Sequence, residues 1–262
     1  MQKDRPSKSA FRTPRVAILL AAGLGKRQQP LTNQTPKPLL CAENRPLIDY
    51  AIDAVVYSGI KTVYVVTNYL EGQIIDHLTK NRKDRFELVC CHQNTTKGTA
   101  NAVHAVQRHA KSIAGISNYV VISATDYVFS EGYIKALIDF HTAGSHDISV
   151  SLRGIDKKKA ADSSRAELGA DGRLKRINEK PANVEDDNNI VAATLLYIAP
   201  VEIFNFVSSA NESIRGEYEL ADVINNMINS GYRASGLKQP SIIEPNFQPQ
   251  GNRGDACDLN RN

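Results

Sequence analysis

Short apolar runs rich in β-branched residues alternate with segments of helical periodicity over the first 150 residues of this chain. The apolar runs at 16–20, 62–67, 86–91 and 119–123 predict strands, and the periodic segments at 45–58, 71–78, 100–110 and 131–142 predict helices. A strand, a helix and a second parallel strand form a right-handed crossover. The alternation therefore predicts an α/β fold whose mainly parallel sheet is covered by helices on both faces.

The pattern changes after residue 152. Further strands are predicted at 148–152 and 190–198, and helices at 201–207 and 220–229. Between them lies a polar insertion, around residues 153–189, with a lysine-rich stretch and a hairpin expected to turn at Asp171-Gly172. We interpret residues 15–262 as a single domain that carries this insertion.

The excess positive charge of the chain lies at its start. The 32 Lys+Arg against 28 Asp+Glu give +4, and residues 1–15 hold five basic residues and one acidic residue, which is also +4. The remainder is balanced, with 27 residues of each sign. Residues 1–14 are polar and without hydrophobic period, so we expect a mobile basic tail. Spread charges of this kind are typical of a solvated terminus, and we expect no nucleic-acid partner.

Composition also bears on location. The apolar run 16–22 is short and leads into Gly-Leu-Gly-Lys-Arg without a small-residue cleavage site, which argues against a signal peptide. No segment approaches the roughly 20 apolar residues of a membrane span. The cysteines form no C-x-x-C pair, so zinc is not expected, and Cys90 and Cys91 are predicted to be buried or half-buried free thiols. A reducing, cytoplasmic location is expected.

The loop at residues 19–40 carries the strongest functional signal. It follows the first predicted strand, where open α/β sheets place their ligands. It lacks the third glycine of a dinucleotide fingerprint, and Arg27 follows Gly25-Lys26 where a P-loop needs Ser or Thr. Its glycines expose backbone N–H groups, and Arg27 and Lys37 add fixed cations. From the residues alone, a triphosphate-binding loop and a Gly/Pro-rich surface connector both remain open.

The segment from Leu20 to Leu39 resembles the nucleotide-binding loop of the sugar-1-phosphate nucleotidylyltransferases, L-A-A-G-x-G-x-R-x-x-P-L-T-x-x-x-P-K-P-L. The resemblance implies a Rossmann-like, GT-A-like three-layer sandwich with a mainly parallel mixed sheet. It also implies that Arg27 grips the β- and γ-phosphates and that Lys37 stabilises charge at the α-phosphate. The positions that it assigns to nucleotide contact in this loop are Leu20, Ala22, Gly23 and Gly25.

Two further segments resemble the family's nucleotide and metal motifs. Residues 93–100 resemble Q-x-x-x-x-G-T-A, in which Gln93 would read the base while Gly98 and Thr99 lie against it. The apolar run 120–126 ends in Asp126, the position of a Mg²⁺ ligand in the family. Thr125 stands where relatives usually carry glycine.

The acceptor motifs follow in the expected order. Residues 179–181 resemble E-K-P and 216–222 resemble G-E-x-x-L-T-D. By resemblance, Glu179 and Glu217 accept hydrogen bonds from acceptor hydroxyls, and Lys180 binds the acceptor phosphate. Thr194 is assigned to the acceptor as well, in a segment where Leu195 occupies the place of the family's glycine.

The end of the chain resembles the family's last motif with departures. Residues 250–259 place Asn252 at the second metal ligand, the usual tryptophan is absent, and Asp255 replaces threonine. An amide ligand supplies less charge to a cation than a carboxylate does. These departures keep open the interpretation of a catalytically silent regulatory homologue that binds nucleotide or nucleotide sugar.

Taken together, the motifs imply a Mg²⁺-dependent nucleotidyltransferase that joins a nucleoside triphosphate to a sugar 1-phosphate and releases pyrophosphate. Its partners would be these two small molecules, with no membrane and with a homodimer as a possibility. Ala22 and Gln93 predict a pyrimidine donor, UTP or CTP, because the alanine methyl restricts a larger ring. Leu195 leaves a second interpretation open, a cytidylyltransferase for a non-sugar phosphorylated or phosphonate acceptor.

Overall fold

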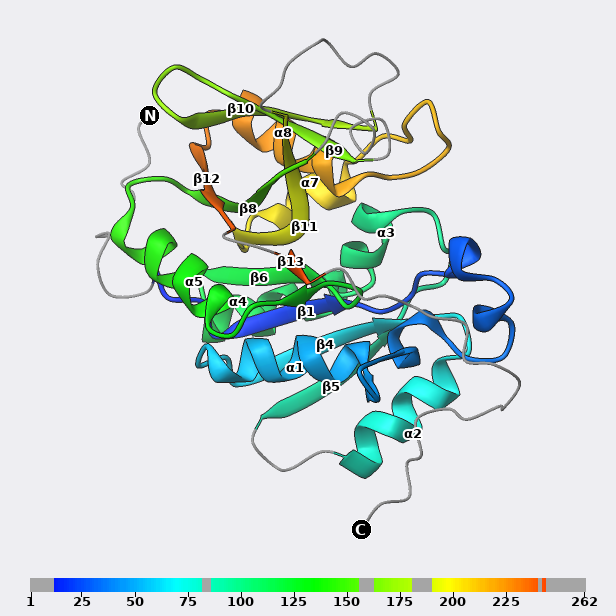
Figure 1. Ribbon diagram of the computed structural model, residues 1–262. Coiled ribbons are helices and arrows are strands. Elements are labelled where there is room, and N and C mark those ends of the chain that lie inside the picture. The colour runs from blue at the N-terminus through cyan, green and yellow to red at the C-terminus, as the bar shows by residue number, and fades with distance from the viewer. Residues whose placement is uncertain (1–11, 82–85, 156–162, 181–189, 240–241, 244–262) are drawn as a thin grey trace.

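The computed structural model describes residues 12–81, 86–155, 163–180, 190–239 and 242–243. Its centre is one sheet of nine strands, which are β1 (Val16–Leu20), β4 (Thr62–Thr67), β5 (Glu87–His92), β6 (Tyr119–Ala124), β8 (Ile148–Gly154), β9 (Ser164–Leu168), β10 (Arg173–Glu179), β11 (Val191–Pro200) and β12 (Ala234–Lys238). The strand order is β5-β4-β1-β6-β11-β8-β12-β10-β9 (Figure 1). Short pairs join β2 (Cys41–Ala42) to β3 (Arg45–Pro46) and β7 (Val128–Phe129) to β13 (Ile242–Ile243).

The first half of the sheet is parallel. β1 lies between β4 and β6, and β5 pairs with the outer edge of β4, all in parallel. The near-continuous apolar sequences of β1, β4 and β6 fit this arrangement, because a parallel strand is buried on both faces. β11 then runs antiparallel to both β6 and β8, which makes the sheet mixed. The four strands predicted in this half are confirmed, with ends that differ by one residue at most.

Helices cover both faces of the sheet (Figure 1). The core cluster on one face includes residues of α1 (Leu47–Tyr57), α2 (Glu71–Asn81) and α5 (Tyr133–Ala143). The cluster on the other face includes residues of α3 (Thr99–His104), α4 (Ala110–Ile116), α7 (Ile203–Ser208) and α8 (Leu220–Asn229). The predicted three-layer sandwich is therefore confirmed. Among the described residues, none of the helices combines the length and the apolar character that crossing a lipid bilayer would require.

One predicted helix is divided. The periodicity of 100–110 predicts a single helix, whereas the structure ends α3 at His104 and continues through a 3₁₀ turn, Gln107–His109, into α4. The N–H of Val106 bonds to the carbonyl of Val103 at 3.0 Å, an i to i+3 bond that tightens the chain. The tighter turn changes the direction of the helix while Val103, Val106 and Ile113 all remain buried in one cluster.

The second half of the sheet bends back on itself. The hairpin of β9 and β10 turns at Asp171-Gly172, as predicted, with Gly172 at a φ of +73°. β10 pairs with β12, and β9 also pairs with the first residues of β11. The five strands β11, β8, β12, β10 and β9 therefore form a closed ring of pairings. The polar insertion is thus part of the sheet from residue 164 to 179.

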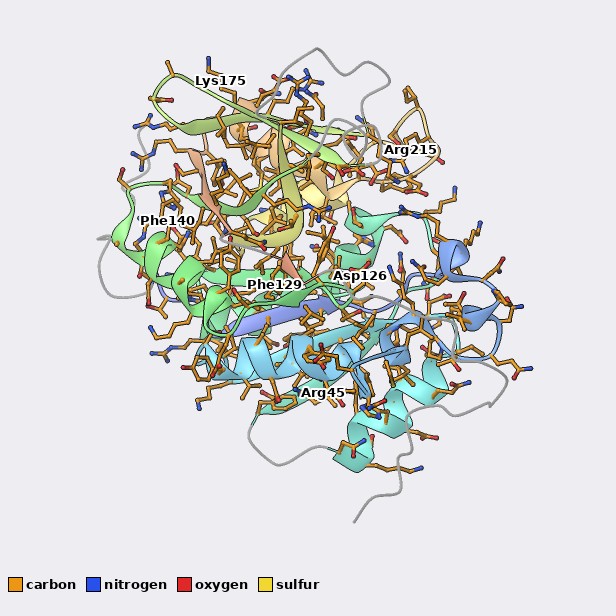
Figure 2. The ribbon with its side chains drawn as sticks, in the orientation of Figure 1. Arg45, Asp126, Phe129, Phe140, Lys175 and Arg215 are labelled. Carbon is orange, nitrogen blue, oxygen red and sulfur yellow. The ribbon has the colours of Figure 1, made fainter. Side chains whose placement is uncertain are left out.

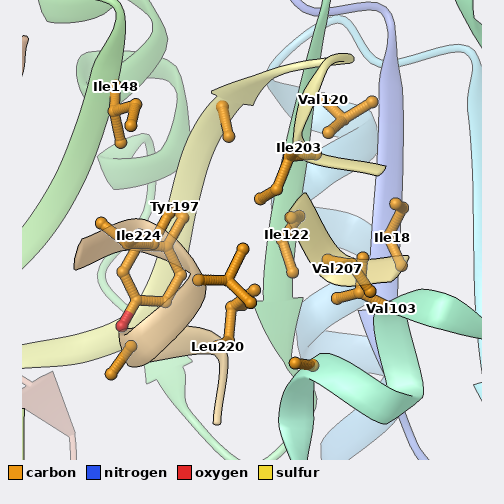
Figure 3. Packing of buried hydrophobic residues seen from close by; sticks show 14 of the residues in the cluster. Ile18, Val103, Val120, Ile122, Ile148, Tyr197, Ile203, Val207, Leu220 and Ile224 are labelled. Atoms are coloured by element: carbon orange, nitrogen blue, oxygen red, sulfur yellow. The ribbon is translucent and has the colours of Figure 1, made fainter. Parts of the chain in front are cut away.

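Two apolar clusters pack against the sheet. Figure 3 shows part of one of them, in which Tyr197 of β11 lies beside Leu220 and Ile224 of α8. Neighbouring residues of a strand contribute to opposite clusters, as Ile18 and Leu19 do on β1. The free thiol predictions also hold, since Cys91 is buried and Cys90 is half-buried.

The start of the described chain is anchored at the amino end of β1. Arg12 donates through Nη2 to the carbonyl oxygen of His141 at 3.2 Å and to that of His146. Its guanidinium also lies 5.8 Å from the ring centroid of Tyr119. Residues 12–14 therefore differ from the mobile tail expected for 1–14, because Arg12 finds carbonyl acceptors and an aromatic face that its sequence context does not reveal.

Two histidines beneath Arg12 share one hydroxyl. His141 Nδ1 lies 2.9 Å and His146 Nε2 lies 2.8 Å from Ser149 Oγ. His141 is fully buried, and burial, with the nearby charges of Arg12 and His146, lowers its pKa from 6.5 to about 3. Burial, Arg12 and Arg233 also lower the pKa of His146, while Asp147 opposes the shift. Both rings are therefore neutral in the folded protein at neutral pH.

We expect this pair to make the protein sensitive to acid. The unfolded chain binds protons at these histidines below pH 6.5, whereas folded His141 does so only near pH 3, so the free energy of unfolding falls as pH decreases between these values. The loss is up to about 1.4 kcal/mol per pH unit for each proton. Urea unfolding at several pH values should give a shallower slope for His141→Gln than for the wild type. The control His104→Gln removes an exposed histidine and should leave the slope unchanged; equal slopes in all three would contradict the prediction.

Candidate active site

A cavity of about 770 Å³ opens at the carboxyl ends of β1 and β6. Its walls come from the loop after β1, the segment around the start of α3, the end of β6, the end of β10, one face of β11 and the segment before α8. Nearly all residues that the sequence assigned to the site line it, namely Leu20, Ala22, Gly23, Gly25, Arg27, Lys37, Gln93, Gly98, Thr99, Asp126, Glu179, Lys180 and Glu217.

Thr194, which the sequence assigned to acceptor contact, does not line the cavity. Side chains alternate along β11, so Ala193, Leu195 and Tyr197 line the cavity while Thr194 points to the other face. Thr194 is 1% exposed, and its Oγ1 donates to Ser151 Oγ at 2.6 Å. It therefore stabilises the packing behind the wall and is not placed to contact an acceptor. The other prediction without a place in this cavity, Asn252, lies outside the described residues.

The loop after β1 folds back on itself. Its three 3₁₀ turns span Lys26–Gln28, Leu31–Asn33 and Lys37–Leu39. Gly25 has a φ of +63°, and a Cβ there would lie 2.7 Å from Thr32 Cγ2 and 3.2 Å from Lys37 Cβ. Thr32 Oγ1 also donates to the carbonyl of Gly25 at 2.9 Å. Only glycine therefore permits the close approach that brings Arg27 and Lys37 to one cavity.

Lys37 and Asp126 form an ion pair inside the cavity. Lys37 Nζ lies 2.5 Å from Asp126 Oδ2, and both side chains are largely shielded from solvent. Asp126 stands just beyond the end of β6, near the middle of the molecule (Figure 2). Its other oxygen, Oδ1, is buried and accepts no hydrogen bond from the described residues. A buried carboxylate oxygen without a partner costs free energy, so this atom is suited to a ligand that the cavity receives.

A divalent cation fits this oxygen. Mg²⁺ in phosphate-transfer sites uses one or two carboxylates together with substrate phosphate oxygens. Within the described part of the chain, no three His, Cys, Asp or Glu residues converge in a metal-binding group. Among the described residues, Asp126 is therefore the ligand available to the cation, and oxygens of a bound substrate would supply others.

The opposite wall carries three carboxylates around one guanidinium. Arg215 lies 3.0 Å from Glu219, 3.6 Å from Glu217 and 3.7 Å from Glu179 (Figure 2 labels Arg215). Ser164 Oγ also donates to Glu179 Oε2. Burial raises the pKa of Glu219 to about 7, the charge of Glu179 adds to the rise, and Arg215 opposes it. Arg215 therefore balances only part of the negative charge of this wall.

Sequence reasoning missed several residues of this wall. Arg215 and Glu219 flank Glu217 in the turn that precedes α8, and the ion pairs of Arg215 with Glu217 and Glu219 bring the three side chains together. Their closeness in sequence to Glu217 was the available signal. Tyr197 is 2% exposed and lines the cavity, and burial with the charge of Glu179 raises the pKa of its hydroxyl. Tyr197 is therefore a neutral hydrogen-bond donor or acceptor in this wall.

Lys180 reaches the cavity through an unusual backbone conformation. Its φ is +43°, in the left-handed region that residues with a Cβ rarely adopt. The N–H of Lys180 donates to the carbonyl of Ser163 at 3.2 Å, which holds the turn. Such backbone strain costs about 1–3 kcal/mol and concentrates at functional sites. We interpret the strain as the cost of directing a cation into the cavity at the end of β10.

Hydrogen bonds join the two segments that the sequence assigned to the nucleotide and to the acceptor, residues 93–100 and 216–222. The N–H of Ala100 donates to the carbonyl of Tyr218 at 2.8 Å, and the N–H of Leu220 donates to Thr99 Oγ1 at 2.8 Å. Gly98 has a φ of +98°, and a Cβ there would lie 2.6 Å from the carbonyl oxygen of Tyr218. Gly98 is therefore required by contact with the acceptor segment, in addition to any contact with a base.

Comparison with known proteins agrees with this arrangement. The family model described as nucleotidyl transferase matches residues 16–241. The chain is 27% identical over 215 residues to the bifunctional protein GlmU of Methanococcus maripaludis strain S2, which covers 82% of the chain and 47% of GlmU. It is 26% identical over 246 residues to a glucose-1-phosphate thymidylyltransferase of Streptomyces antibioticus, which covers 94% of the chain and 65% of that protein. The chain thus spans about half to two thirds of the length of these relatives.

Solved structures share the fold. A UDP-glucose pyrophosphorylase in complex with UDP-glucose superposes with a TM-score of 0.72 at 21% identity, covering 88% of this chain and 93% of that one. A putative glucose-1-phosphate thymidylyltransferase of Bacillus anthracis gives a TM-score of 0.72 at 21% identity, covering 87% of each chain. These likenesses confirm the Rossmann-like α/β sandwich that the sequence predicted.

The contact between Gly98 and Tyr218 predicts a sharp cost for a single methyl group. We expect Gly98→Ala to lower the free energy of unfolding by about 2–5 kcal/mol, because backbone strain and overlap with a carbonyl oxygen add. Gly72→Ala is the matched control, since a Cβ at this position in α2 meets no atom within 4 Å. It should stabilise the protein by about 0.5–1 kcal/mol. Urea unfolding measures both; equal stabilities of the two variants would contradict the packing described here.

Proposed function

The chain belongs to the nucleotidyl transferase family, and we propose that it joins a nucleoside triphosphate to a sugar 1-phosphate with release of pyrophosphate. The observation that carries the proposal is the pairing of Lys37 with Asp126 in the cavity, where the second carboxylate oxygen of Asp126 is buried and has no hydrogen-bond partner among the described residues. Arg27 and Lys180 add cations on the walls of the same cavity. This arrangement suits two phosphate groups that must approach each other.

On the nucleotide side, the proposed roles follow the loop after β1. Arg27, which is exposed and lines the cavity, would bind the β- and γ-phosphates. Lys37 is held in one position by Asp126 and would neutralise charge that develops at the α-phosphate. The backbone N–H groups near Gly23 and Gly25 would donate to further phosphate oxygens. A Mg²⁺ ion bound through Asp126 Oδ1 would supply additional positive charge to these oxygens.

On the acceptor side, the polar wall matches a polyhydroxylated molecule. Glu179, Glu217 and Glu219 would accept hydrogen bonds from hydroxyl groups, and the neutral Tyr197 hydroxyl could donate or accept one more. Lys180 would bind the acceptor phosphate. This phosphate is already ionised at neutral pH, so the reaction requires alignment with the leaving pyrophosphate and needs no covalent nucleophile on the protein.

A pyrimidine nucleotide, UTP or CTP, is the proposed donor. Ala22 is 3% exposed and lines the nucleotide end of the cavity, where its methyl group restricts the space for a larger ring. One methyl group accounts for only about 1–3 kcal/mol of discrimination, so some use of purine nucleotides is expected.

One observation favours a second candidate. Leu195 lines the cavity between Ala193 and Tyr197 on the acceptor side and occupies volume there. A smaller acceptor, such as a phosphorylated alcohol or a phosphonate, would fit beside this side chain better than a sugar. The second candidate is therefore a cytidylyltransferase for a non-sugar acceptor.

A substrate panel tests these proposals. Each of the four nucleoside triphosphates and dTTP would be combined with sugar 1-phosphates, phosphorylated alcohols and phosphonates, with pyrophosphate release and mass spectrometry as readouts. We expect turnover with UTP or CTP and a sugar 1-phosphate. Turnover with non-sugar acceptors alone would favour the second candidate. Nucleotide binding without turnover by any pair would refute the enzymatic proposal and indicate a regulatory protein.

The free oxygen of Asp126 predicts a metal-dependent effect. Asp126→Asn should lower kcat at least 100-fold, since the amide keeps the shape of the side chain but gives a cation no negative charge. Mn²⁺ binding in the presence of nucleotide, followed by electron paramagnetic resonance, should weaken in parallel. Asp139→Asn is the control, because Asp139 is exposed on α5 and pairs with Lys135 away from the cavity. Unchanged Mn²⁺ affinity in Asp126→Asn would rule out Asp126 as a metal ligand.

A further inference from the structure

Gln93 is held by four hydrogen bonds, two of its side-chain amide nitrogen and two of its backbone. Gln93 is 3% exposed, and its Nε2 donates to Asn101 Oδ1 at 2.7 Å and to the carbonyl of Gly98 at 3.4 Å. Its backbone N–H donates to the carbonyl of Thr67 at 2.8 Å, and its own carbonyl accepts from Asn68 Nδ2 at 2.7 Å. Both the backbone and the amide nitrogen are therefore held by the protein.

The carbonyl of Gly98 determines which way the amide points. If the amides of Gln93 and Asn101 were both reversed, Gln93 Oε1 would face the carbonyl oxygen of Gly98, and two acceptors would oppose each other. The orientation with Nε2 toward the protein avoids this repulsion. Among the described residues, no group donates to Gln93 Oε1, so the carbonyl oxygen is the atom left to contact a ligand in the cavity that Gln93 lines.

Asn101 acts on this amide from outside the cavity. It lies in the first turn of α3 and is not among the residues that line the cavity. Its Oδ1 accepts the 2.7 Å bond from Gln93 and a longer one, 3.4 Å, from Thr95 Oγ1. The Asn101 bond is the shorter of the two that hold Gln93 Nε2, so it contributes most to fixing the amide.

We propose that Asn101 is a positioning residue that holds the Gln93 amide with its oxygen toward the nucleotide base, and that the preferred donors are therefore those with an imide base, uracil or thymine. The proposal rests on the proposed function: of its two donors, UTP and CTP, it selects UTP, and it adds dTTP, whose base has the same imide edge. The selection requires the fixed oxygen to lie opposite N3 of the base, where an imide presents an N–H that donates to it and cytosine presents an unprotonated nitrogen that it repels. A fixed acceptor discriminates between them, and an amide free to rotate accommodates both.

Two variants of Asn101 distinguish an effect on the position of the Gln93 amide from a general effect on the fold. Asn101→Asp keeps an oxygen that accepts a hydrogen bond from Gln93 Nε2. Asn101→Ala removes this oxygen, and alanine is compatible with the helical position of residue 101. For the wild type and Asn101→Asp we expect UTP and dTTP to exceed CTP in kcat/KM. For Asn101→Ala we expect the ratio of UTP to CTP to fall about tenfold, the effect of one hydrogen bond of about 1.4 kcal/mol. A ratio that is the same in all three proteins, or a preference of the wild type for CTP, would overturn the proposal.

Equilibrium binding tests the role of Asn101 in base selection separately from the proposed catalytic activity. Isothermal titration of UTP and CTP without an acceptor measures base selection even if no acceptor supports turnover. Selective UTP binding that Asn101→Ala loses and Asn101→Asp keeps would support the role of Asn101 independently of catalysis. Equal affinity of the folded wild-type protein for UTP and CTP, or binding of neither, would refute it.

Discussion

The parallel pairing of β1 with β6 is the constraint on which the site depends. The two strands are in register from Val16 opposite Val120 to Leu20 opposite Ala124, so their carboxyl ends stop at the same level. The loop after β1 and Asp126 after β6 consequently meet, although about 90 residues separate Lys37 from Asp126 in sequence. The pairing is stabilised by strands that are buried on both faces, where hydrogen bonds cannot be exchanged with water. The ion pair between Lys37 and Asp126 is thus a consequence of sheet register.

The same register explains how far the sequence could predict the site. Apolar strands buried on both faces leave a clear pattern, so the position of Asp126 at a strand end could be predicted from its sequence. Thr194 could not, because alternation along β11 places it on the opposite face from Leu195, and motif position alone does not tell which of two neighbouring side chains faces the cavity. Of the acidic wall, the sequence predicted Glu179 and Glu217 but not Glu219. Glu219 is recognised as part of the site only from its burial beside Arg215 in the structure.

The backbone contact between the segments of Gly98 and Tyr218 links the two halves of the cavity. Thr99 Oγ1 accepts the N–H of Leu220 at the start of α8, so the segment that carries Glu217 and the segment that follows Gln93 are held together. A displacement of one segment would break buried hydrogen bonds of the other, each of which contributes about 0.5–1.5 kcal/mol. Ligands bound to the two segments are therefore expected to affect each other through this contact, since both benefit from the same ordered backbone.

The two walls of the cavity differ in how far their charges are balanced. Lys37 pairs with one carboxylate, whereas Arg215 is shared among three, so negative charge remains on this wall. Burial raises the pKa of Glu219 to about 7, and the charge of Glu179 adds to the rise. On the proposed function, a phosphorylated acceptor that entered with its phosphate toward this wall would meet repulsion, whereas the reverse orientation would leave its phosphate for Lys180 and its hydroxyl groups for the carboxylates. The acidic wall would then contribute to alignment by disfavouring the wrong orientation as well as by accepting hydrogen bonds in the right one.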